Sequence, residues 1–189
     1  MLKINGKYYT KNNTGEVTVF EYESMLAQSD LIVVKNLLET IDFKDSVAKP
    51  INIRKQPYRK IIDAQGLIEQ SPQFIQVIIE IFFGVDCRDE PIIEWYATAD
   101  SILKQLKEIV DLEHKKLKPP PTRIELEKAG IDKLNVYGVY NRVRSLMESM
   151  NMTYEQVLNT PYEEIFVHLS YNNDRAWIEH RLSEQTKIK

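Results

Sequence analysis

The chain has 189 residues with a net charge of −3 at pH 7, and its hydrophobic fraction of 43% is enough for a packed core. Charged residues make up 28%, close to the share in ordinary soluble domains, which excludes wholesale disorder. Proteins held on nucleic acid by phosphate contacts carry a basic surplus, so nucleic acid is not an expected partner.

The first 22 residues have the pattern of a small β-meander. The turn signals Asn5-Gly6 and Asn13-Thr14-Gly15 bound short alternating runs such as residues 7–10 and 17–20. Asp30 is a candidate N-cap for the helix that follows. This helix is indicated by apolar residues that recur at helical spacing, namely Leu31, Val34, Leu37, Leu38 and Ile41.

Residues 43–58 have the composition of a connection between helices. They include a short extended piece, residues 51–53, because Pro50 and Pro57 discourage a helix on either side. We expect this piece to pair with the meander. Apolar spacing then predicts a helix over residues 58–69.

Two longer helices are predicted after this point. The first has Ser71 as its N-cap, Pro72 at its first helical position, an apolar body at residues 74–83 and Gly84 at its end. Its apolar residues occupy most of its circumference, so it should be buried. The second covers residues 92–117, with a break expected near Asp100 and Ser101.

The three consecutive prolines at 119–121 mark the clearest boundary in the sequence. A run of prolines cannot continue a helix and favours a stiff, extended spacer. We therefore expect two domains, residues 1–118 and residues 119–189.

The second domain is expected to be wholly helical. A short helix should end at Gly130, and a longer one should cover residues 135–150. Thr153 and Thr160 are each followed three residues later by Gln or Glu, which is the pattern of a capping box. The predicted fold class is thus mainly α, a helical body with a small N-terminal β-meander.

Three features indicate a soluble protein in a reducing compartment. Cys87 is the only cysteine, so no intramolecular disulfide can form. The N-terminus lacks the continuous apolar region of a signal peptide. The most apolar stretch, residues 74–85, is too short to cross a bilayer, so no membrane segment is expected.

No catalytic motif, cofactor site or metal site is predicted. The glycines are scattered singly and form neither a phosphate-binding loop nor a nucleophile elbow. His114, His168 and His180 lack Cys or carboxylate partners at recognised ligand spacing. Glu164 and His168 lie on one helical face, but such pairs are common by chance. An enzyme whose residues converge only in the fold remains an alternative.

The acidic residues around Cys87 and the basic clusters have simpler structural explanations. Asp86, Asp89 and Glu90 lack the ligand spacing of a calcium loop and would disfavour a thiolate, so a solvated loop is expected. Lysines and arginines at helix ends commonly complement the last carbonyl groups. A helix-turn-helix after residue 135 would present Glu155 to phosphates, so we expect a helical hairpin there.

Aromatic residues are the strongest pointer to a binding function. Tyr and Trp are enriched at protein interfaces because they bury large areas and keep a polar group. The partner-binding candidates are Trp95, Tyr96, Tyr154, Tyr162 and Trp177, drawn from a wider set that also includes Tyr137, Tyr140 and Tyr171. The alternative is that these rings are half-buried core residues.

The order of these features resembles the tail assembly chaperones of tailed bacteriophages. Residues 61–110 contain the apolar helix 74–84, an acidic connector and another helix. Residues 140–147 and 152–165 are similar to the short helix, polar turn and proline-aromatic-acid ending of such proteins. The N-terminal meander is not part of this pattern.

This resemblance implies a non-enzymatic assembly factor in the host cytoplasm. Such a factor binds the tape measure protein, or other tail proteins, and prevents its aggregation while the tail tube forms. The alternative is a structural subunit of the virion, in the tail, baseplate or connector region. Homo-oligomerisation and the identity of the partner stay open.

Overall fold

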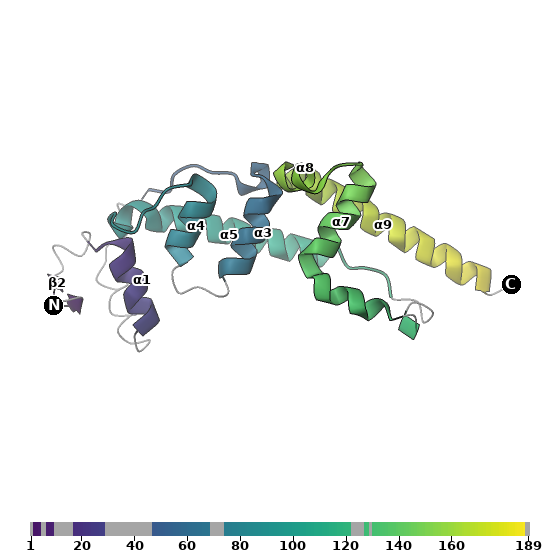
Figure 1. The fold of residues 1–189 in the computed structure, drawn as a ribbon, viewed down its shortest axis with the longest axis horizontal. Helices are drawn as coiled ribbons and strands as arrows, with labels where there is room; N and C mark the ends of the chain where they lie inside the picture. The colour runs from purple at the N-terminus through teal and green to yellow at the C-terminus, as the bar shows by residue number, and fades with distance from the viewer. Residues whose placement is uncertain are drawn as a thin grey trace. The chain divides into compact units, whose positions relative to one another are not determined.

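A computed structural model of the chain is mainly helical, as the sequence predicts (Figure 1). It describes residues 2–4, 7–9, 17–28, 47–68, 74–121, 127–128 and 130–187. The chain forms two compact units. Unit 1 comprises Met1–Ile53 and Asp63–Leu106, and unit 2 comprises Arg54–Ile62 and Lys107–Lys189.

The division between these units differs from the predicted domain boundary at the prolines. Helix α5, Ile92–Lys116, continues through residues 106 and 107, where unit 1 gives way to unit 2. Pro119, Pro120 and Pro121 therefore lie inside unit 2. The reason is that the last part of α5 carries Glu113, which binds side chains from the C-terminal helices.

The predicted β-meander is not supported, because its last run is helical. Strands β1, Leu2–Ile4, and β2, Lys7–Tyr9, pair antiparallel, with Leu2 opposite Tyr9. The run at 17–20 instead leads into α1, Val19–Gln28. The predicted helix after Asp30 lies outside the described residues.

A capping box explains why α1 begins there. The backbone N–H of Glu21 donates to Thr18 Oγ1 over 3.2 Å, and the N–H of Thr18 donates to Glu21 Oε2 over 3.1 Å. These reciprocal bonds satisfy groups that a helix start leaves unpaired. The run Val17-Thr18-Val19-Phe20 alternates like a strand, but this local capping favours the helix.

The connection before α3 also differs from its prediction. Ile53–Lys55 form a 3-10 helix, η3, so the extended piece predicted over residues 51–53 does not include Ile53. The Gln105 amide holds this segment, since it accepts from the N–H of Ile53 and donates to the carbonyl of Ile51. Helix α3, Tyr58–Ile68, forms where the apolar spacing predicts it.

Two further predictions for the middle of the chain have opposite outcomes. Helix α4, Phe74–Phe83, is confirmed, and it ends at Gly84, which has the positive φ of +69° that suits glycine. Ser71, its predicted N-cap, lies outside the described residues. The break near Asp100 is wrong, because α5 is continuous and Asp100 pairs with Lys104 one turn later at 2.7 Å.

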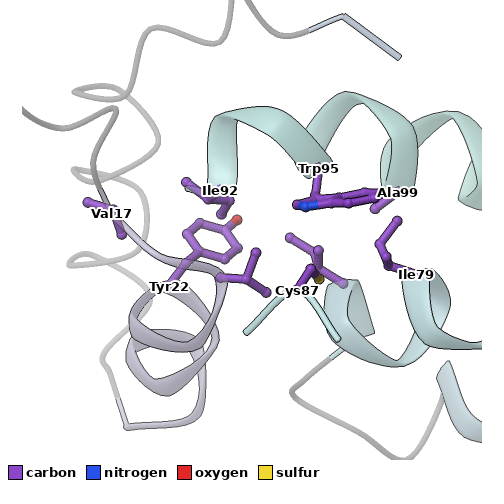
Figure 2. Packing of buried hydrophobic residues seen from close by; sticks show 9 residues of the cluster. Val17, Tyr22, Ile79, Cys87, Ile92, Trp95 and Ala99 are labelled. Carbon is purple, nitrogen blue, oxygen red and sulfur yellow. The ribbon is translucent and has the colours of Figure 1, made fainter. Parts of the chain in front are cut away.

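The core of unit 1 gathers side chains from α1, α4 and α5 around Cys87 (Figure 2). Figure 2 shows Tyr22, Ile79 and Trp95 pointing toward the cysteine from these three helices. Tyr22 also meets Tyr96 edge-on at 6.4 Å between ring centroids. These contacts make α4 the buried helix that its composition predicts.

Unit 2 is built mainly from helices near the C-terminus. A 3-10 helix, η4, Ile131–Tyr137, leads into α7, Gly138–Met150. Two more helices follow, α8, Tyr154–Asn159, and α9, Tyr162–Lys187, and α7 contacts η4, α8 and α9. No helix among the described residues is long and apolar enough to cross a membrane.

The two predicted capping boxes in unit 2 have different outcomes. Thr153 caps α8, because its hydroxyl accepts from the N–H of Gln156, whose side chain accepts from the N–H of Thr153. Thr160 does not start α9. Its hydroxyl donates to the carbonyl of Gln156 over 2.8 Å, and Thr160 ends α8 instead.

Candidate functional site

A buried carboxylate ties three helices of unit 2 together. Glu113 on α5 is 9% exposed. Its Oε1 accepts from the Tyr162 hydroxyl of α9 over 3.0 Å, and its Oε2 accepts from Arg142 Nη1 of α7 over 3.0 Å. Hydrogen bonds to a charged group stabilise a fold by roughly 1.5–3 kcal/mol each, so this cluster fixes α7 and α9 against α5.

Aromatic packing strengthens this cluster. The ring of Tyr58 from α3 lies 6.3 Å from that of Tyr162. Burial raises the pKa of both tyrosines, and the negative charge of Glu113 adds to the effect at Tyr162. Both hydroxyl groups therefore stay protonated. Together with Glu113 and Arg142, the two tyrosines form the support on which α7 rests, which we call the base of α7.

An exposed apolar surface lies on the segment that this base supports. We call it the tyrosine patch, which consists of Leu134, Val136, Tyr137, Val139, Tyr140 and Tyr154. Val136 is 86% exposed and Tyr137 57%. The rings of Tyr137 and Tyr140 lie 6.5 Å apart, and those of Tyr140 and Tyr154 lie 6.3 Å apart. The three rings thus form a continuous row.

The local backbone explains why these apolar side chains point outward. Gly138 has a positive φ of +39° at the junction of η4 and α7, where the helical path changes. Asn141 donates to the carbonyl of Leu134 across this junction. Val143 and Leu146, about one and two turns beyond Tyr140, are fully buried. The buried part of α7 therefore begins after its first turn, and the tyrosines lie on the exposed segment before it.

The structure separates the five aromatic candidates predicted from the sequence. Trp95 is 3% exposed in the core of unit 1, where its indole donates to Glu90, and Tyr96 packs against the same core. Tyr162 is 1% exposed and binds Glu113. Trp177 is half-buried, and its indole donates to the carbonyl of Lys118 over 2.9 Å.

Tyr154 is the candidate that lies on an exposed surface, within the tyrosine patch. Its neighbours Tyr137 and Tyr140 belong to the wider aromatic set but not to the five candidates. The overlooked signal is the sequence Leu-Asn-Val-Tyr-Gly-Val-Tyr at 134–140. Five of these seven residues are apolar or aromatic and exposed, which is unusual for a surface without a binding role.

The surroundings of Cys87 do not make it reactive. Its thiol and its N–H both donate to the side-chain oxygen of Gln76, over 3.2 and 3.1 Å. Burial, with the nearby Glu23 and Glu90 charges, raises the pKa of the thiol to about 12. The loop is therefore not solvated at Cys87, contrary to the prediction, although Asp86 and Arg88 beside it are exposed.

A second buried carboxylate lies in unit 1. Glu23 on α1 is 1% exposed, and its Oε1 accepts from the N–H of Gln76 near the start of α4 over 2.9 Å. Burial raises the pKa of Glu23 to about 7, although the hydrogen bonds from the backbone of α4 act in the opposite direction. Within the described ranges, no three His, Cys, Asp or Glu side chains gather closely enough to hold a metal ion.

Comparison with known proteins adds no family assignment to this geometry. No protein family, no curated protein and no solved structure matches the chain. The exposed tyrosine patch, supported by the Glu113 cluster, is therefore the candidate binding surface of the chain.

Proposed function

We propose that this chain is a non-enzymatic assembly factor of the phage tail assembly chaperone type. In this proposal it binds tape measure or other tail proteins in the host cytoplasm and keeps their apolar helices from aggregating. The feature that carries the proposal is the tyrosine patch. The likeness of the sequence to such chaperones, at residues 140–147 and 152–165, includes two of the tyrosines in the patch.

The chemistry of the patch suits an apolar helical partner. Each tyrosine offers a large flat area with few rotatable bonds, so little conformational entropy is lost on binding. Its hydroxyl remains available for a hydrogen bond at the rim. Val136 and Val139 add exposed aliphatic surface on the same segment. The base formed by Glu113, Arg142 and Tyr162 keeps the patch in place before a partner arrives.

A pull-down from cells that co-express the tagged chain with phage tail proteins tests this proposal. We expect recovery of a tail protein, and we expect Tyr137→Ser/Tyr140→Ser to reduce that recovery at least tenfold. Phe20→Ser is the matched control, because Phe20 is an exposed aromatic residue of α1 outside the patch. Its recovery should equal that of the parent chain.

Two outcomes would count against this function. If the parent chain recovers no tail protein, or if the tyrosine variant recovers as much as the control, the patch does not bind such a partner. Mass spectrometry of purified virions decides the alternative. Stoichiometric copies in mature particles would favour a structural subunit of the tail, baseplate or connector region over a chaperone that leaves after assembly.

A further inference from the structure

Helix α9 carries a second exposed apolar surface, separate from the tyrosine patch. We call it the outer stripe, which consists of Val167, Tyr171, Ile178 and Leu182. These four side chains are between 58% and 65% exposed. At 3.6 residues per turn they fall within an arc of about 60°. They therefore form one narrow line along α9, the C-terminal helix of the ribbon in Figure 1.

The opposite side of α9 is already used within unit 2. Tyr162 and Ile165 are buried there, and Asn173 and Trp177 donate to the carbonyls of Lys116 and Lys118 over 3.1 and 2.9 Å. The helix is thus apolar on two opposite sides. A helix that only covers its own unit needs one apolar side, so the outer stripe indicates a second contact.

Charged residues flank the outer stripe in a pattern that complements itself. Asp174 and Arg181 lie on one flank, seven residues apart. Arg175 and Glu179 lie on the other and form an ion pair along the helix at 2.9 Å. Each flank therefore carries one acid and one base.

We propose that two copies of this chain associate through the outer stripe, with their α9 helices antiparallel and a two-fold axis near Ile178. In this arrangement Tyr171 of each copy packs against Leu182 of the other, and the two Ile178 side chains meet at the axis. A two-fold interface uses the same surface on both copies, which a self-complementary stripe satisfies. This inference is independent of the proposed function, because it involves neither the tyrosine patch nor a tail protein.

The charges favour the antiparallel orientation over the parallel one. In an antiparallel pair, each flank of one helix lies against the same flank of the other helix, and the two flanks run in opposite directions. Asp174 of each copy therefore faces Arg181 of the other. On the second flank, Arg175 approaches Glu179 of the other copy. A parallel pair would bring Asp174 against Glu179, and two acids at that distance repel.

Sedimentation of the full-length chain over a concentration series tests the association. We expect the mass to rise with concentration from 22.2 kDa to twice that value. Ile178→Glu should remain at the monomer mass throughout. Val47→Glu is the matched control, since it places the same charge on an exposed valine outside both the stripe and the tyrosine patch, and it should associate like the parent.

A charge exchange tests the proposed contacts. Asp174→Arg should weaken association at least tenfold, and the double variant Asp174→Arg/Arg181→Asp should restore it. A parent chain that stays monomeric up to about 0.5 mM would overturn the proposal. So would a dimer that Ile178→Glu leaves intact, or a double variant as weak as the single one.

Cross-linking of single introduced cysteines tests the orientation. Cys87 is buried, so it should not react with a short bifunctional maleimide in the folded chain. Ile178→Cys should cross-link two copies because it lies at the axis. Val167→Cys should not, because 11 residues of helix on each side place the two cysteines about 30 Å apart. Efficient cross-linking at both positions would show a parallel pair and refute the antiparallel arrangement.

Discussion

Substitution of Glu23 by glutamine should make the protein more stable at pH 8 and change the pH dependence of its unfolding. The Glu23 carboxyl is buried, and its pKa rises from 4.5 to about 7 in the folded chain. The folded state therefore binds this proton more tightly than the unfolded chain does. Its contribution to stability is fully present below about pH 4.5 and is lost as the pH rises through about 7.

The expected magnitude follows from the same values. At 1.36 kcal/mol per pH unit, a rise from 4.5 to about 7 corresponds to about 3 kcal/mol of stability lost by pH 8. Glutamine keeps an oxygen that accepts from the N–H of Gln76 but never ionises. We expect Glu23→Gln to exceed the parent by about 2–3 kcal/mol at pH 8 and to equal it within about 1 kcal/mol at pH 4.5.

Urea unfolding at the two pH values measures this difference. Trp95 lies in unit 1 with Glu23, so its fluorescence in a Trp177→Phe background follows the relevant unit. Glu94→Gln is the matched control, because Glu94 is exposed on α5. A Glu23→Gln variant less stable than its parent at pH 8 would refute the reasoning. It would mean that the hydrogen bonds at the start of α4 outweigh the burial of the charge.

Three further changes test other parts of the fold. Tyr162→Phe removes a hydrogen bond to the Glu113 carboxylate, and urea unfolding should show a loss of roughly 1.5–3 kcal/mol. Gly84→Ala should lower the free energy of unfolding by about 1–2 kcal/mol in the same assay. An added Cβ at this position would meet no atom within 4 Å, but alanine is strained at a φ of +69°. The Cys87 thiol should react with Ellman's reagent at least 100-fold faster in denaturant than in the folded chain, since it is buried with a raised pKa.

The sequence predicts correctly those helices for which the local sequence patterns agree with one another. Apolar spacing locates α3, an apolar run that ends at Gly84 locates α4, and the Thr153 capping box locates the start of α8. At Thr18 two local signals compete, and the alternating pattern suggests a strand where the capping box starts a helix. Choosing between such signals depends on which tertiary contacts each one permits.

The positions of the aromatic side chains depend on partners far away in the sequence. Tyr162 is buried because Glu113, 49 residues earlier, accepts its hydrogen bond. No sequence pattern predicts that Tyr162 and Glu113 will meet. From the sequence, Tyr162 therefore cannot be distinguished from an exposed tyrosine near a helix start. Tyr137 and Tyr140 are exposed because the buried part of α7 begins only at Val143. The spacing of apolar residues predicts a helix, but the point along the helix at which burial begins depends on packing.

Tyr162, which binds Glu113, lies beside a short antiparallel bridge between Pro57 and Pro161, and this bridge has a consequence for how the chain folds as it is synthesised. The N–H of Tyr58 donates to the carbonyl of Thr160 over 2.9 Å, and the N–H of Tyr162 donates to that of Gln56 over 3.0 Å. Unit 2 therefore closes a loop of roughly 100 residues, and its first segment leaves the ribosome long before its partner. Until residue 162 emerges, Tyr58 on α3 and Glu113 near the end of α5 lack the Tyr162 side chain that contacts both, and at this stage the nascent chain is most exposed to aggregation.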